Sequence, residues 1–251
     1  SILVGDIKKV YKRWTDEANI RRDKYPLEDV STPDQRFKRL RNSWHKLHEA
    51  EHSVKKNLAE RLRLQRELFF QPLCEALGYK FKAVSEPALI GGEAYQIPLI
   101  GEVKNDKGEP YLWLVECFNP TNEGIDPLDL SISNTWMCQI NDPSLGYVLG
   151  DETWELLIGK RIFGQDSPPR WVIAVSRDQI LLIDRQKWAS SRLLRFDLEV
   201  LFGEYNPDAL MAATTLLHKE HTCPTNGGIP YLDDLDENSH KHAYEVSDDL
   251  K

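Results

Sequence analysis

The 251-residue sequence is poor in cysteine and has no long apolar run. Its four cysteines, at positions 74, 117, 138 and 223, stand far apart without a C-x-x-C pair. Zinc sites usually need such paired spacing, so free, buried thiols in a reducing prokaryotic cytoplasm are expected. No stretch approaches the roughly 18 uncharged apolar residues that would cross a bilayer, so no membrane partner is expected.

Several catalytic motifs are also missing. The sequence has no glycine-rich phosphate loop and no G-x-S-x-G, which argues against a P-loop nucleotidase and a nucleophile-elbow hydrolase. The charged start "SILVGDIKKVYKRW" is unlike a signal peptide and lacks Met, and the final "SDDLK" lies in a helix-like pattern. We therefore expect a piece of a longer polypeptide, whose remainder is one of its partners.

Charge is unevenly distributed along the chain. Residues 1–80 carry 18 Lys+Arg and 12 Asp+Glu, whereas residues 81–251 carry 14 and 28. A basic segment on an acidic body suggests a contact with a polyanion, although a solvated helix surface would have the same composition. The basic residues that could contact nucleic acid are Lys8, Lys9, Lys12, Arg13, Arg36, Lys38, Arg39, Arg41, Lys55 and Lys56.

Helical periodicity dominates the first third. Apolar residues at helical spacing predict a helix over 2–25, a break at "YPLEDVSTPD" with Thr32 or Asp34 as the next cap, and a long amphipathic helix or helical hairpin from 35 to about 71. Pro72 should kink this helix and Gly78 should end it. Residues 1–77 are accordingly predicted to form a helical, net basic arm.

From residue 79 the pattern changes to short strands. Three β-rich runs, the last two joined by the turn signal "NDKG", precede a loop-like stretch, a helix over 151–163 capped by Asp151, and the strand pair "RWVIAVSRDQILLIDRQKW". This order predicts an α/β (α+β) fold, in which long N-terminal helices precede a mixed-sheet sandwich. Residues 78–220 would form the core and 221–251 a junction with a missing downstream domain.

One strand places a carboxylate in an apolar setting. In "GEPYLWLVECFNP", four apolar residues run directly into Glu116. Burying a carboxylate costs several kcal/mol unless it is paired, protonated or metal-bound. Two interpretations remain open: Glu116 pairs with an Arg or Lys of the long helices, or it is a metal ligand.

The order of these elements resembles a known family. The similarity lies in five successive elements: a helix ending in "ELFFQPLCEALGY", a hairpin that carries an acid, a helix, the pair "WVIAVS-RDQ-ILLID" and the stretch "LRFDLEVLFG". In these elements the chain is similar to the nuclease-like N-terminal region of large type IIG restriction–modification DNA methyltransferases and their phage-defence relatives. The resemblance covers roughly residues 60–251. It implies a core of the PD-(D/E)xK nuclease type.

Such a core holds Mg²⁺ with an acid on its second strand and a Glu-x-Lys on its third. Mapped here, the resemblance assigns these metal ligands to Glu93 and Glu116, puts Phe118 at the lysine position and a helix acid near Glu67. A degenerate site that binds no cofactor is therefore expected, with Mg²⁺ only if it is active. The S-adenosylmethionine pocket would lie in the missing downstream domain.

A literal Glu-x-Lys also occurs at Glu102 and Lys104, just before the "NDKG" turn. Charged residues are usual at such an exposed strand end, but a migrated catalytic pair is the alternative.

Three functions are thus left open. The first is a DNA-engaging module that binds double-stranded DNA through its basic helices and has a degenerate nuclease site. The second is an active Mg²⁺-dependent endonuclease that uses Glu93, Glu102, Lys104 and Glu116 as catalytic residues. The third is a protein–protein scaffold without a nucleic-acid role, with exposed apolar patches on residues 36–77.

Overall fold

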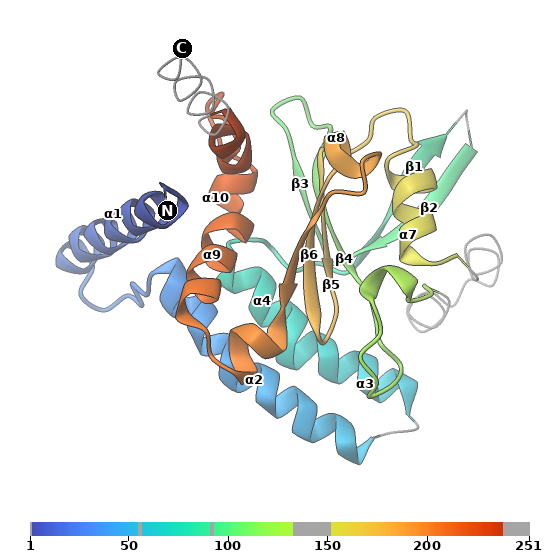
Figure 1. Ribbon diagram of the computed structural model, residues 1–251, viewed down its shortest axis with the longest axis horizontal. Helices are drawn as coiled ribbons and strands as arrows, with labels where there is room; N and C mark the ends of the chain where they lie inside the picture. The colour runs from blue at the N-terminus through green and yellow to red at the C-terminus, as the bar shows by residue number, and fades with distance from the viewer. Residues whose placement is uncertain (1, 55–56, 91–92, 133–151, 238–251) are drawn as a thin grey trace, which may run out of the picture.

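Figure 1 shows the computed structural model of the chain, which describes residues 2–54, 57–90, 93–132 and 152–237. For residues 2–4, 84–90 and 93–96 only the backbone is described. Residues 238–251 of the predicted junction, and Cys138, lie outside this part of the chain. None of the described helices is long and apolar enough to cross a membrane.

The N-terminal helices follow the predicted pattern closely. Helix α1 (Ile2–Lys24) ends before the predicted break, and α2 (Pro33–Ser53) begins after Thr32, whose backbone N–H donates to the Gln35 side chain. Proline at the first helical position costs no hydrogen bond, which explains why the helix can start there. Of the two forms predicted for residues 35–71, the structure contains the helical hairpin.

The second arm of this hairpin is not a uniform α-helix. Asn57 caps α3 (Leu58–Gln65) through its side chain, a π-helical turn η1 (Arg66–Phe70) follows, and α4 (Gln71–Ala76) completes the arm. Gly78 then adopts a φ of +83°, a left-handed conformation that glycine tolerates well, and the chain turns toward the strands.

The strands form two sheets. β1 (Val84–Ile90) pairs antiparallel with β2 (Glu93–Leu99). The second sheet has the order β3-β4-β5-β6-β7 and is mixed, because β4 and β5 are parallel whereas the other neighbours are antiparallel. Its strands are β3 (Gly101–Lys104), β4 (Pro110–Glu116), β5 (Trp171–Val175), β6 (Gln179–Asp184) and β7 (Leu194–Asp197). The predicted mixed α/β class is confirmed at this level.

Helices cover both faces of the five-stranded sheet (Figure 1). One face carries Leu112, Leu114 and Ile173, and it packs against the hairpin of α2 to α4 and against α9 (Pro207–Leu217). The other face carries Trp113 and Val115 and packs against the following short helical segments. They are the 3₁₀ turn η2 (Pro127–Asp129), α7 (Trp154–Leu156) and the π-helical turn η3 (Leu157–Ile162).

Some local predictions need correction. The helix after the loop is capped by Thr153, whose hydroxyl accepts from the Leu156 N–H, and Asp151 lies outside the described residues. β7 was not predicted as a strand, because only its hydrogen bonds to β6 make the short segment "LRFD" extended. The remaining helical segments are α8 (Arg185–Trp188), the π-helical turn η4 (Glu199–Gly203) and α10 (Lys219–Thr222).

Candidate functional site

The most highly charged part of the interior lies where the parallel strands β4 and β5 end. Glu116 is the last residue of β4 and pairs with Val175, and Ser176 and Arg177 continue from β5. The second arm of the helical hairpin passes over this edge. The carboxyl ends of parallel strands are a common location for binding sites in α/β folds, so this edge is the candidate site.

Glu116 is held by one arginine of the helical hairpin. Along β4 the side chains of Leu112, Leu114 and Glu116 alternate onto the face covered by α2 to α4, and Glu116 is only 1% exposed. Arg66 Nε donates to one carboxylate oxygen over 2.6 Å, and an Arg66 terminal nitrogen contacts the other. The structure therefore contains the ion pair that the first interpretation of Glu116 predicts, in the bidentate form that suits guanidinium and carboxylate groups.

The residues that follow Glu116 are apolar and buried. Phe118, at the position predicted for the lysine of the motif, is 1% exposed, and Cys117 is fully buried. Burial raises the pKa of the Cys117 thiol well above its ordinary value, so the thiol stays protonated at neutral pH. No ammonium group can reach the Glu116 carboxylate from this strand position.

The Glu102 and Lys104 pair does not share a face with Glu116. Glu102 lies opposite Trp113 across the antiparallel β3–β4 ladder, so its side chain is on the Trp113 face. Glu116 lies on the other face because it is three residues from Trp113. Lys104 Nζ and Glu102 Oε1 are 3.3 Å apart and half-exposed at the sheet edge. One metal ion bound by both glutamates is not compatible with this register.

The other two acids of the predicted site, Glu93 and Glu67, lie on β2 and on the helical hairpin. Glu93 opens β2 opposite Ile90, and its side chain is outside the described set. Glu67 is exposed and pairs with Arg63; both line a hollow of about 330 Å³ whose wall includes Arg66. Arg66 thus lies between this hollow and the Glu116 carboxylate. Among the described residues, no group of three His, Cys, Asp or Glu side chains could hold a metal.

A second ionic network, which sequence reasoning missed, lies beside the first. Glu51 is 1% exposed, and its two oxygens lie 3.3 Å from Arg61 and from Arg177 respectively. Gln65 Nε2 donates to Glu51 over 2.6 Å and to the carbonyl of Asn119 over 3.0 Å. Two buried guanidinium groups therefore share one buried carboxylate.

The same arginines fix the loop that follows β4. The Thr121 carbonyl accepts from Arg61 over 2.6 Å and from Arg177 over 3.1 Å. Arg61 also donates to the side chain of Asn122 over 2.9 Å. Guanidinium groups thus neutralise and cross-link the end of the sheet, where a metal nuclease would need open carboxylates.

A signal for Glu51 is present in the sequence. The buried positions of α2 run in steps of three and four residues, and Glu51 continues the series. They are Phe37, Leu40, Trp44, Leu47 and Glu51. A charged residue at the next position of an apolar stripe indicates a buried charge, and it was not recognised because charged residues of amphipathic helices are usually solvated.

The predicted basic surface is partly used inside the molecule. Arg41 donates to the Phe202 carbonyl over 2.7 Å, Arg36 to the Ser31 carbonyl over 2.6 Å, and Arg13 pairs with Glu220. Two others have exposed acidic partners, Lys9 with Asp6 and Arg39 with Asp29.

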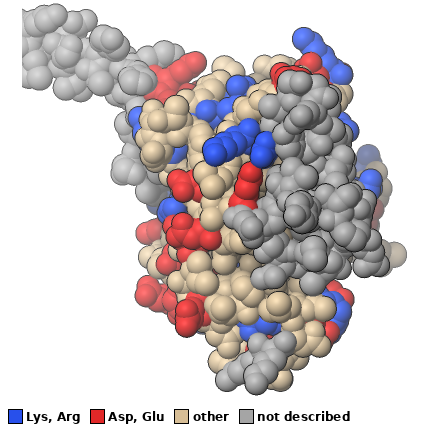
Figure 2. All heavy atoms as spheres, turned by 90° about the vertical axis from the view of Figure 1, so that its right-hand side faces the viewer, with Lys and Arg blue, Asp and Glu red and all other residues tan. Residues whose placement is uncertain are grey.

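Three lysines remain directed to solvent. Lys8 and Lys12 are exposed on α1 without an ion pair to any described residue, and Lys38 lies 5.3 Å from the Tyr205 ring centre. Lys55 and Lys56 fall outside the described residues. On the face shown in Figure 2, which is turned away from α1, basic and acidic side chains are interspersed without a continuous basic surface among the coloured atoms.

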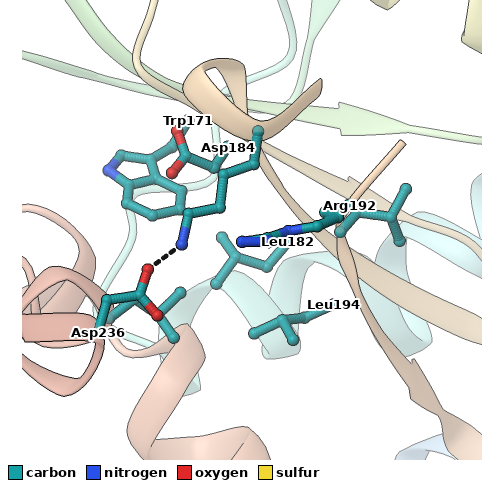
Figure 3. Close-up of a pocket in the computed structure, with 9 residues that line it drawn as sticks. Trp171, Leu182, Asp184, Arg192, Leu194 and Asp236 are labelled. Atoms are coloured by element: carbon teal, nitrogen blue, oxygen red, sulfur yellow. Dashed lines mark hydrogen bonds and ion pairs between the residues drawn. The ribbon is translucent and has the colours of Figure 1, made fainter. Parts of the chain in front are cut away.

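A separate pocket of about 220 Å³ opens near Trp171 (Figure 3). Lys187 and Asp236 both line this pocket and form an ion pair, and Arg192 extends over Leu182. Trp171 begins β5 whereas Glu116 is level with its last residue, so this pocket lies at the opposite end of the sheet from the candidate site. It does not give access to Glu116.

Comparison of the chain with protein-family models, with curated proteins and with solved structures gives no match.

Proposed function

We propose that the chain is a nuclease-like module that engages double-stranded DNA without cutting it, and that it is the N-terminal part of a restriction–modification (phage-defence) DNA methyltransferase. The observation that carries the proposal is the state of Glu116. Its carboxylate is buried and held on both oxygens by Arg66, and Phe118 replaces the lysine of the motif.

The arrangement of elements supports this proposal. A helix precedes a meander of strands that ends with β4, and α7 with η3 then leads to β5, parallel to β4. This is the order from which the resemblance to the nuclease core was inferred, and Glu116 lies at the end of the strand assigned to its Glu-x-Lys. Metal-assisted hydrolysis needs open ligand positions for the metal and water, which a carboxylate held by a guanidinium does not supply.

Two observations weigh against the alternatives. An active site that joins Glu102 and Glu116 would need them on one face of the sheet, and the β3–β4 register separates them. For the scaffold, exposed apolar patches were expected on residues 36–77. The large apolar residues exposed among the described positions lie outside that range: they are Ile20, Tyr25, Leu27, Leu156, Leu194 and Ile229.

We expect the chain to bind a duplex at low salt and to leave supercoiled plasmid intact with Mg²⁺ or Mn²⁺. Gel shifts across a salt series should show affinity falling steeply, because phosphate contacts release counterions. Replacing Lys8, Lys12 and Lys38 by Gln should reduce the slope of log K against log salt by about 0.9 for each phosphate contact that is lost.

A matched control removes the same charge from the body, by replacing Lys80, Lys82 and Lys107, which are exposed and belong to neither α1 nor α2, by Gln. The slope of this control should stay near that of the parent chain. Metal-dependent cleavage that disappears in a folded Glu116→Gln variant would establish the endonuclease instead. If no duplex binds even at low salt, the DNA proposal is wrong and the scaffold remains.

A further inference from the structure

Helix α1 is attached to the body along one narrow stripe. Ile7 and Trp14 are 3% exposed, and Tyr11 lies between them on the same helix face, while most other described side chains of α1 are exposed. The stripe meets α9 and α10, which stand between α1 and the sheet (Figure 1). Such an attachment can open without disturbing the core of the sheet.

Glu220 of α10 is the polar centre of this attachment. One of its oxygens, Oε1, accepts from the Trp14 indole N–H and from Arg13, both over 2.6 Å, and lies 3.1 Å from His221 Nε2. The His221 and Trp14 rings are stacked with their centres 5.6 Å apart. The two ends of the described chain are therefore joined here by aromatic and charged groups together.

His218 lies beneath Trp14 in a different environment. The two ring centres are 5.3 Å apart in an edge arrangement, and His218 is 8% exposed. Neither ring nitrogen has a hydrogen-bond partner among the described residues. A neutral imidazole tolerates this site far better than an imidazolium, because a buried charge without a partner is costly.

Four charged or titratable groups face His218: Arg13 from α1, Arg36 from α2, and Glu220 and His221 from α10. Glu220, whose Oε1 is 4.0 Å from His218 Nδ1, favours protonation, and the other three oppose it. Burial outweighs them and lowers the pKa of His218 from 6.5 to about 4.

We propose that α1 is an acid-releasable arm: Trp14 covers His218 while the imidazole is neutral, and protonation of His218 opens the contact between α1 and α9–α10. Release exposes the stripe of Ile7, Tyr11 and Trp14 together with His218. This inference concerns the attachment of α1 and holds whether or not the chain binds DNA.

The sign of the pH dependence follows from the lowered pKa of His218. In the released state the exposed ring regains a pKa near 6.5, so that state binds more protons than the docked state between pH 6.5 and about 4. Docking is fully stabilised above pH 6.5 and weakens as pH falls, by up to about tenfold in its equilibrium constant per pH unit. Burial raises the pKa of Glu220, and its bonds to His221, Arg13 and Trp14 lower it by more, so its carboxylate stays ionised through this interval while α1 is docked.

The test is a pH titration of the full chain by ¹H–¹⁵N NMR. We expect the Trp14 indole N–H signal, assigned with Trp14→Phe, to lose its carboxylate-bonded shift between pH 6.5 and 4. Amide exchange in α1 should accelerate over the same interval, while the amides of β5 and β6 remain protected and report an intact core.

Two variants separate His218 from other histidines. His218→Gln, checked by the protection of β5 and β6, should remove the pH transition of Trp14, because no titrating ring remains beneath the indole. His52→Gln, an exposed position of α2, should keep it. An unchanged transition in His218→Gln would overturn the proposal. So would a Trp14 signal that stays constant to pH 4, since α1 would then remain docked throughout the interval in which release is expected.

Discussion

Replacing Arg66 by Met is expected to lower the free energy of unfolding by about 3 kcal/mol, because Glu116 would lose its bidentate partner while remaining 1% exposed. Methionine keeps much of the apolar stem of arginine, so the loss of stability should come mainly from the missing positive charge. Urea unfolding followed by circular dichroism measures it, with the midpoint shifting and the slope unchanged.

The matched control is Arg63→Met on the same hairpin arm. Arg63 pairs with Glu60 and Glu67 in an exposed position, where solvent screens such pairs and they contribute little to stability, so this variant should unfold close to the parent midpoint. The double variant Arg66→Met with Glu116→Gln should recover most of the lost stability, because it leaves no buried charge. A double variant as unstable as Arg66→Met alone would show that packing, and not the carboxylate, explains the loss.

Glu51→Gln is expected to cost about 3–5 kcal/mol, although the side chains are almost the same size. Arg61 and Arg177 share the Glu51 carboxylate, and their side chains are 1% and 7% exposed. Without it two guanidinium groups face each other in the interior, hydrogen-bonded to neutral groups, and the partly exposed Asp178, 3.5 Å from Arg177, replaces only part of the lost charge. Thermal unfolding of the variant should show a much lower midpoint.

Glu49→Gln makes the same chemical change on the same helix at an exposed position, and we expect an effect within about 0.5 kcal/mol. Adding Arg177→Met to Glu51→Gln should restore part of the stability by removing one of the two opposed charges. If Glu51→Gln proved as mild as Glu49→Gln, the network would contribute little through its charges, and its role in fixing the Thr121 loop would rest on hydrogen bonds alone.

Local signals in the sequence predicted most elements. Pro33 and Thr32 set the start of α2, Gly78 the end of the helical hairpin, and "NDKG" the turn between β3 and β4, where Gly108 has a φ of +80°. These features depend on the conformational limits of single residues, so the sequence contains the information locally. β7 was missed because its extended form depends on pairing with β6.

The sequence predicted that Glu116 would need a partner, but it did not predict which residue the partner would be. An apolar strand that ends in Glu116 required a partner for the carboxylate, and a basic residue of the long helices was one of two expected partners. Arg66 is the partner because of the way the helical hairpin lies across β4. This placement also depends on the π-helical turn η1, which no feature of the sequence predicted. The opposite faces of Glu102 and Glu116 followed only from the strand register.

The parallel pairing of β4 with β5 also has a consequence for the order of folding. Each strand belongs to an antiparallel hairpin of its own, β3–β4 or β5–β6, but the two hairpins are joined through the long connection over residues 117–170. Closing a long loop is entropically costly and slow compared with forming a hairpin. We therefore expect two early hairpin units that dock late, with Glu51 and Arg177 losing their water only in that last step.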